Sequence, residues 1–159
     1  MTNGADQITP SQKQAWDRFR KAGRIVTFRV NRDLKTECGI TLSGFDALCA
    51  LESSASHRLS ITELTRKLPM TRTAVSRLID RELISAGYVC KTTGDGDKRE
   101  RWASLTPHGV AVLKDTIHPQ HSKAVMAHFA MPLDEDKAKL LCRIFAWMND
   151  QKSRRPRHG

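Results

Sequence analysis

Apolar residues recur at spacings of three and four along residues 10–38, a pattern that predicts one long amphipathic helix. The stripe consists of Trp16, Phe19, Gly23, Val26, Val30 and Leu34. The segment Thr9-Pro10-Ser11-Gln12 predicts the start of this helix, because it offers a capping hydroxyl, an early proline and a glutamine three residues after the cap. Gly39 predicts the end, since glycine readily adopts the left-handed conformation that closes helices.

Shorter apolar runs between residues 40 and 87 predict three further helices. Each begins at a residue able to cap a helix N-terminus: Thr41 or Ser43 for the first, Ser60 for the second and Thr71 for the third. Pro69-Met70 separates the second from the third, and Gly87 closes the third. Two short helices joined by a tight turn are typical of a helix-turn-helix, whose second helix enters the major groove of DNA.

Two runs of strand-forming residues follow, at 88–92 and 101–105, with glycines at 94 and 96 predicting a turn between them. Thr106-Pro107 then predicts a new helix directly after the second run. Helices followed by a hairpin with a charged tip form the layout of a winged helix-turn-helix. The expected fold class is therefore mainly α with a small β-hairpin wing.

Two more helical segments are predicted after residue 106. The first carries Val110, Leu113 and Ile117 on one face, and Pro119 is expected to kink or end it, with a continuation through residues 125–129. The last begins at Asp134 and contains the apolar residues Leu140, Leu141, Ile144, Trp147 and Met148.

Composition narrows the classes of function. The 159 residues carry a formal net charge of +10, the electrostatic signature expected of a nucleic-acid binder. The chain shows no apolar run long enough for a membrane span and no signal peptide, so a cytoplasmic location is expected. It also lacks a phosphate loop, a nucleophile elbow and a zinc-protease motif, so neither an enzyme nor a cofactor is expected.

The residues expected to contact double-stranded DNA fall into two groups. The first turns of the predicted recognition helix supply Thr71, Arg72, Thr73, Ser76 and Arg77, whose hydroxyls suit phosphates and whose arginines suit guanine. The hairpin supplies Lys98, Arg99 and Arg101, which suit a narrow minor groove. Asp97 is expected to orient Arg99 through a charge-assisted hydrogen bond. A solvated polar helix face and a solvated hairpin of mixed charge are the alternatives.

These motifs resemble those of the MarR family of bacterial transcription regulators. Asp97-x-Arg99, followed by Leu105-Thr106-x-x-Gly109, matches the wing signature of that family, and Thr73–Ile79 resembles its recognition helix. The resemblance covers residues 10–150. Residues 81–87 depart from the Leu-rich Arg-Leu-Glu pattern that the family usually keeps, and Pro119 is unusual within a dimerisation helix.

The resemblance implies a homodimer that represses transcription from a palindromic operator and releases it on meeting a small molecule. It divides the chain into a flexible N-terminus (1–8), a helical dimerisation region (9–39 and 107–150), a winged helix-turn-helix (40–106) and a basic flexible tail (151–159). It also predicts an effector pocket where the two parts meet. A small aromatic or anionic ligand would there contact Trp16, Phe19, Arg20, Phe45 and Leu113, although Trp16 and Phe19 fit an apolar core equally well.

Other chemistry remains open as alternatives. His118, His121 and His128 lie close in sequence and with Cys142 offer zinc ligands, but surface histidines without a metal are the favoured interpretation. The four cysteines are widely separated and are expected to be free thiols, with Cys49 and Cys142 in the core and Cys38 the most exposed. The alternative functions are an effector-independent architectural DNA-binding protein, a thiol-based redox sensor, or a winged helix that binds protein.

Overall fold

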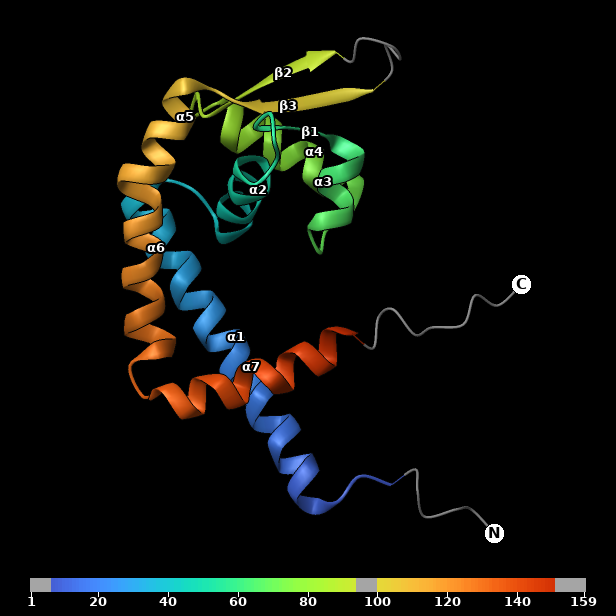
Figure 1. Cartoon of the computed structure of the whole chain (residues 1–159), viewed down its shortest axis with the longest axis vertical. Coiled ribbons are helices and arrows are strands. Elements are labelled where there is room, and N and C mark those ends of the chain that lie inside the picture. The colour runs from blue at the N-terminus through green and yellow to red at the C-terminus, as the bar shows by residue number, and fades with distance from the viewer. Residues whose placement is uncertain (1–6, 94–99, 151–159) are drawn as a thin grey trace, which may run out of the picture.

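The computed structural model describes residues 7–93 and 100–150 (Figure 1). The N-terminal half contains α1 (Pro10–Cys38), α2 (Leu42–Glu52), β1 (Arg58–Ser60), α3 (Ile61–Lys67), α4 (Arg72–Leu78) and the π-helix η1 (Ile79–Ile84). The C-terminal half contains β2 (Val89–Thr93), β3 (Arg101–Leu105), α5 (Pro107–Val112), η2 (Leu113–Ile117), α6 (His118–Val125), η3 (Met126–Ala130) and α7 (Glu135–Asp150). The expected fold class, mainly α with a small β-hairpin, is confirmed.

The helix starts predicted from capping residues are confirmed. Five predicted capping hydroxyls each accept a hydrogen bond from the amide three residues later, which satisfies one otherwise unpaired amide of the first turn. They belong to Thr9, Thr41, Ser60, Thr71 and Thr106. Gly39 closes α1 with a left-handed φ of 71°. Local sequence signals therefore set most helix boundaries in the molecule.

The predicted hairpin is part of a three-stranded antiparallel sheet with the order β1-β3-β2. β2 pairs with β3 along its whole length, from Val89 opposite Leu105 to Thr93 opposite Arg101. The three-residue strand β1 pairs on the other side of β3, with Leu59 opposite Ala103. The sequence did not predict β1, and its pairing joins the wing to the start of α3.

The core lies under this sheet and between α2, α3, α4 and η1. Its largest fully buried side chains include Leu34, Leu48, Leu51, Leu64, Val75, Ile79, Leu83, Leu113 and Ile117. They come from every helix of the winged module, from the C-terminal end of α1 and from η2. The module and the adjoining ends of the two long helical segments therefore share one core.

Residues 107–130 form a continuous helical arm in which α-helical and π-helical turns alternate. The expectation that the helix could end at Pro119 is wrong, because the chain remains helical through it. Pro119 lies in the first turn of α6, directly after η2, where the hydrogen-bond register has already shifted. The arm packs along α1, and α7 crosses α1 away from the winged module (Figure 1).

The C-terminal helix α7 differs from the other helices in its lack of burial. None of its residues is buried, and its ring contact with α1 is a tilted pair of Phe19 and Phe145 with centroids 5.9 Å apart. Within the described part of the chain, no helix combines the length and the apolar character that crossing a bilayer requires.

Candidate nucleic-acid interface

The predicted recognition helix α4 presents a polar face to solvent. Val75 and Ile79 are fully buried and anchor the helix on the core, which turns the opposite face outward. Thr71, Arg72, Thr73 and Arg77 are exposed, whereas Ser76 is half-buried. The oxygen Oγ1 of Thr71 caps the helix by accepting from the amide of Ala74 at 3.2 Å. Five predicted residues thus lie on one short segment, four of them open to solvent.

Arg72 and Arg77 differ in how they are held. The Nη1 of Arg72 donates to Oγ1 of Thr62 on α3 at 2.7 Å, so this guanidinium links the two helices of the helix-turn-helix. Arg77 forms no such hydrogen bond with a side chain of residues 7–93 or 100–150, and it lines an open groove of about 870 Å³ beside α4. Among the two, Arg77 is the arginine with the greater freedom to meet a ligand.

Sequence reasoning missed two cations in this groove, Arg81 on η1 and Lys35 on α1. Arg81 lies four residues after Arg77, and residues four apart share one face of a helix, so helical spacing was the signal that could have identified it. No sequence signal placed Lys35 here, because tertiary packing brings the end of α1 beside α4. Arg77, Arg81 and Lys35 together make one wall of the groove positively charged.

A carboxylate ties η1 to the start of α2. Glu82 Oε1 accepts from the amide of Thr41 at 2.6 Å and from its hydroxyl at 2.9 Å. The same hydroxyl accepts from the amide of Gly44 at 3.0 Å, while the amide of Leu42 donates to Asn31 Oδ1 at 2.9 Å. The N-terminus of α2 is therefore bonded to both α1 and η1.

The residues that depart from the family pattern, 81–87, begin within this linked segment. That segment is largely the π-helix η1, whose wider turn changes which residues share a face. Glu82 is half-buried and points toward Thr41. Lys91 of β2 forms an ion pair with Asp80 of the same π-helix. The segment that follows the recognition helix is thus fixed to α2 and to the wing.

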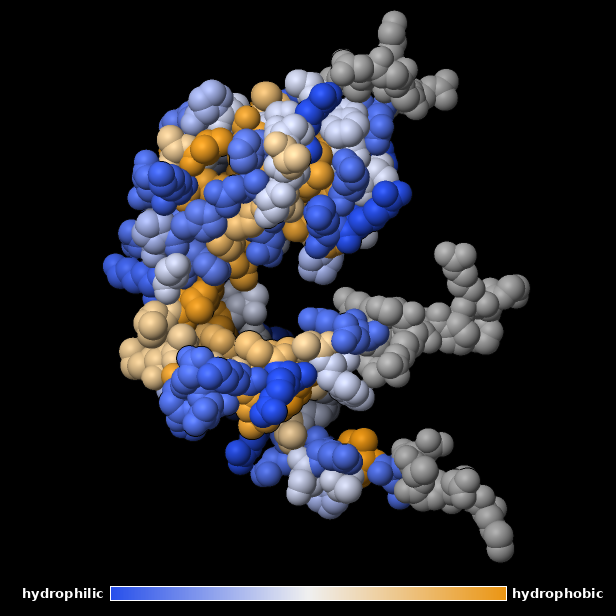
Figure 2. Space-filling view, in the orientation of Figure 1, coloured by the Kyte–Doolittle hydropathy of each residue, from blue (hydrophilic) through white to orange (hydrophobic). Residues whose placement is uncertain are grey.

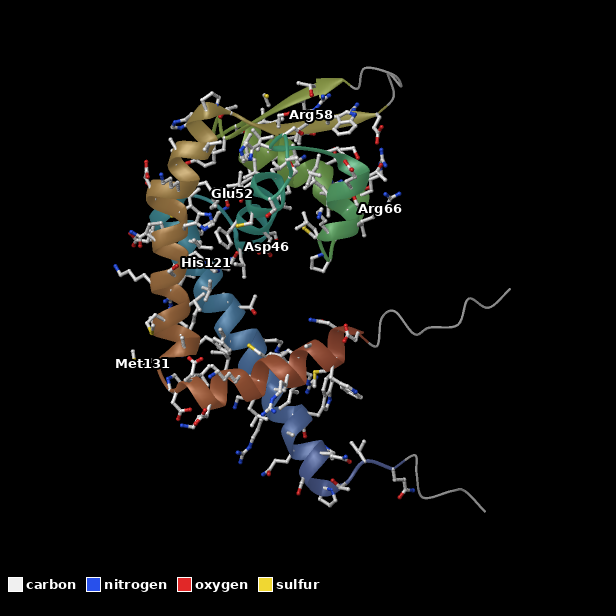
Figure 3. The ribbon with its side chains drawn as sticks, in the orientation of Figure 1. Asp46, Glu52, Arg58, Arg66, His121 and Met131 are labelled. Atoms are coloured by element: carbon white, nitrogen blue, oxygen red, sulfur yellow. The ribbon has the colours of Figure 1, made fainter. Side chains whose placement is uncertain are left out.

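The wing is described only in part. Asp97, Lys98 and Arg99 lie outside the described residues, so the structure says nothing of their predicted roles. Arg101 is exposed at the start of β3. One residue along, the guanidinium carbon of Arg58 lies 4.6 Å from the ring centroid of Trp102, which supports the strand from β1 (Figure 3).

The spacing Leu105-Thr106-x-x-Gly109 has a direct structural reason. The Thr106 hydroxyl donates to the carbonyl of Gly87 at 2.7 Å and accepts from the amide of Gly109 at 2.9 Å. A Cβ on Gly109 would lie 2.1 Å from the carbonyl oxygen of Tyr88. The threonine and the glycine therefore fasten the start of α5 to the chain that leads into β2.

The residues proposed for an effector pocket are not brought together. Trp16 and Phe19 line an apolar groove of about 750 Å³ between α1 and α7, where Arg18 and not Arg20 contributes the cation. Leu113 is fully buried and Phe45 nearly so, both in the core of the winged module. The predicted grouping is wrong because Trp16 and Phe19 lie on the N-terminal half of α1 beside α7, whereas Phe45 of α2 and Leu113 of η2 lie in the core.

Phe45 instead lies under two histidines at the junction of α2 with the helical arm. His121 stacks on its ring with centroids 4.0 Å apart, and His118 meets it edge-on at 5.5 Å. The Nε2 of His118 lies 2.9 Å from Oε2 of Glu52. Burial lowers the pKa of the His121 imidazole, an effect that the nearby Asp46 carboxylate opposes.

The other predicted zinc ligands lie elsewhere. His128 bonds to Asp33 of α1 at 2.6 Å, and Cys142 is exposed on α7. The expectation that Cys142 is buried is wrong, because α7 buries none of its residues. Cys38 is half-buried and less exposed than Cys90 or Cys142, which also corrects the prediction for that thiol. Cys49 is half-buried. Burial raises the pKa of its thiol to about 11, and the negative charges of Glu52 and Asp46 add to this shift.

The fold of this chain is similar to those of solved transcriptional regulators. The structure of Sco3205, a MarR family transcriptional regulator from Streptomyces coelicolor in complex with DNA, superposes with a TM-score of 0.84 at 26% identity, covering 94% of this chain and 92% of that one. The chain shares its fold with MarR family transcriptional regulators. A second MarR family structure, AbsC from the same organism, has a TM-score of 0.82 at 22% identity, over 95% of this chain and all of that one, and supports the fold. No family model matches the chain.

Curated relatives of the chain are transcriptional repressors. The transcriptional repressor MprA of Escherichia coli K12 is 35% identical over 92 residues, which cover 58% of this chain and 51% of MprA. The transcriptional repressor YetL of Bacillus subtilis is 33% identical over 112 residues, or 67% of this chain and 65% of YetL. The chain thus spans about half the length of the first of these relatives. Both are named as repressors, in keeping with the prediction that the chain is not an enzyme.

Proposed function

We propose that this chain is a DNA-binding transcription regulator, and more specifically a repressor. The observation that carries the proposal is the exposed polar face of α4, with Thr71, Arg72, Thr73 and Arg77 standing out from a buried anchor. Arginine on a recognition helix suits paired hydrogen bonds to guanine, and hydroxyls suit phosphate oxygens. The resemblance to a relative solved with DNA supports the same assignment.

We expect the two arginines of α4 to make different contacts with DNA. Arg72 is held by Thr62 and would keep a fixed position against the DNA backbone, while the freer Arg77 would read a base edge or a neighbouring phosphate. Arg81 and Lys35 add positive charge along the same groove. In the wing, we propose minor-groove contacts for Lys98, Arg99 and Arg101, with Asp97 orienting Arg99.

We further propose that the functional unit is a homodimer formed by residues 9–39 and 107–150, with residues 40–106 as its winged module. Large apolar side chains stand exposed on α1 and α7, among them Trp16, Phe19, Leu140, Ile144, Trp147 and Met148. Figure 2 shows apolar surface gathered over the crossing of these helices, away from the more hydrophilic winged module. A second copy would cover this surface.

A symmetric dimer demands a symmetric operator. Two recognition helices related by a two-fold axis fit two half-sites whose centres lie about one DNA turn apart. An effector would release the operator by favouring a different spacing of the two helices, and only to the extent that it binds that state more tightly. Such a regulator acts where the chromosome lies, so the proposal requires a cytoplasmic location.

Selection of bound duplexes from a random pool tests the proposal. We expect recovered sequences to contain an inverted repeat, and the affinity for it to fall steeply as salt rises, because bound phosphates release counterions. Recovery of bent but unrelated sequences would favour an architectural role. Absence of any salt-dependent DNA binding would contradict the proposal and favour a protein-binding winged helix.

A further inference from the structure

We propose that the junction between α2 and the helical arm holds a zinc ion, bound by Cys49, Glu52 and His118. The donor atoms of these three side chains all lie within 4.8 Å of one another in the described structure. Donors around a tetrahedral zinc ion lie roughly 3–4 Å apart, given zinc–ligand bonds of about 2.0–2.3 Å. Small rotations of the side chains would therefore complete the site.

The ligand types favour zinc over the common hard cations. A thiolate and an imidazole are soft or borderline donors, which suit Zn²⁺ and disfavour Mg²⁺ and Ca²⁺. Cys49 and Glu52 lie three residues apart on α2, so both point from one face of that helix. The bond between Glu52 and His118 at 2.9 Å already draws the two helical segments together.

The surroundings also suit a metal. Three protein ligands leave a fourth position open, as in zinc sites that keep a water. Asp46 and His121 lie one turn away on the same two helices, and Figure 3 shows them with Glu52 between α2 and α6. His121, stacked on Phe45, would supply an outer partner of the kind that orients metal ligands.

The position of the site gives it a regulatory role, an extension that rests on the proposed function. α2 belongs to the winged module, whereas His118 begins α6 on the helical arm. Zinc bound across this junction would favour one angle between the two parts. In a dimer, that angle sets the spacing of the two recognition helices and hence the fit to an operator.

Cobalt(II) is the probe for the site, because a bound thiolate gives it a near-ultraviolet charge-transfer band. We expect one equivalent of cobalt per full-length chain, displaced by zinc. Cys49→Ser should remove the band, and Glu52→Gln and His118→Gln should weaken binding at least tenfold. The matched controls Cys142→Ser and His108→Gln should bind as the parent chain does.

Three results would overturn the site: no band at one equivalent, a band that survives Cys49→Ser, or an equal loss in Cys142→Ser. Circular dichroism checks that each variant is folded. If Cys49→Ser does not fold, the zinc-induced rise in melting temperature replaces it as the readout, and its persistence in His118→Gln overturns the site.

Operator affinity, measured by fluorescence anisotropy with zinc or with a chelator, tests the regulatory role separately. We expect at least a tenfold change in the parent chain and none in His118→Gln. A cobalt band with no change in operator affinity would overturn the regulatory role and leave the site standing. Failure to bind any DNA in either state would contradict the proposed function, while the cobalt result still decides the site.

Discussion

At the scale of single residues, the absence of a Cβ at Gly109 lets the start of α5 lie against the backbone of Tyr88, just before β2. Gly109→Ala would place a Cβ 2.1 Å from the backbone oxygen of Tyr88, and neither backbone can move without disturbing the Thr106 cap. We expect a loss of about 1–3 kcal/mol in the free energy of unfolding, the range typical of overpacking. Denaturant titration measures it.

Gly23→Ala is the matched control for that substitution. A Cβ at Gly23 meets nothing within 4 Å, and alanine is the better helix former by roughly 0.5–1 kcal/mol. We therefore expect Gly23→Ala to be neutral or stabilising. Equal losses for both variants would show that the close contact with Tyr88 is not what matters.

A second residue-scale prediction concerns Arg77. Arg77→Ala should weaken operator binding by about 1–3 kcal/mol if the side chain reads a base, with a relaxed preference at one position. If it contacts a phosphate, all sequences should weaken alike and the salt slope should fall by about one. Because Arg77 is exposed, stability should hardly change. Lys114→Ala removes the same charge from an exposed position on η2 and should leave operator affinity nearly unchanged. A similar loss of affinity in Lys114→Ala would show that the effect comes from net charge.

At the scale of elements, the link from η1 to α2 is the clearest determinant of how the recognition helix is oriented. Glu82→Ala removes the acceptor for the amide and hydroxyl of Thr41 and leaves the amide unpaired at the start of α2. We expect about 1–3 kcal/mol lower stability, the cost of an unsatisfied polar group. Glu82→Gln keeps one carbonyl acceptor and should lose less. Identical losses would mean that packing, and not hydrogen bonding, holds this junction.

The contact between α1 and the helical arm should show a pH dependence. The pKa of the Asp33 carboxyl is lowered mainly by its hydrogen bond with His128 and next by its hydrogen bond with Arg32. A lowered folded pKa stabilises the protein above the unfolded value of about 3.9 and ceases to do so as pH falls below it. Asp33→Asn should therefore be less stable than the parent chain near pH 6, and the two should converge below about pH 3.

Thermal unfolding between pH 2 and pH 7 measures this difference. Asp115→Asn, an exposed carboxylate on η2, is the matched substitution outside the contact. A gap between Asp33→Asn and the parent chain that stays constant over the whole range would contradict the role assigned to Asp33.

Local chemistry explains which elements could be predicted. Capping hydroxyls at Thr9, Thr41, Ser60 and Thr71 act within one turn, so the sequence contains the whole interaction, and these helix starts were predicted correctly. The strand β1 is only three residues long and depends on pairing with β3, far along the chain. The π-helical turns likewise depend on packing that no local pattern records.

The candidate sites also differ in whether they depend on local spacing or on long-range packing. The exposed residues of α4 were predictable because the buried Val75 and Ile79 follow helical spacing. The effector pocket was not, because tertiary packing places Trp16 of α1 in a groove with α7 and Phe45 of α2 in the core of the winged module. Cys142 was assigned to the core from its apolar neighbours, but those neighbours lie on a helix that this chain alone does not cover.

At the scale of the whole molecule, the exposed apolar surface of α1 and α7 predicts self-association. Trp147→Glu places a charge on a side chain that is 64% exposed here and would be covered in a dimer. We expect it to shift sedimentation toward the monomer and to lower operator affinity together. Ile8→Glu adds the same charge at an exposed apolar residue outside the proposed dimerisation region and should do neither. A parent chain that is monomeric at micromolar concentration would contradict the proposed dimer.

The lack of burial of α7 also affects how long the protein survives in the cell. It has 16 residues and buries none of them, and a helix of this length is only marginally stable in water by itself. In the proposed dimer, pairing would shelter α7 from proteases, while solitary chains would present it as a cleavable end. Scarce chains would then be degraded faster than abundant ones, and the onset of repression would sharpen with expression level beyond what dimerisation alone produces.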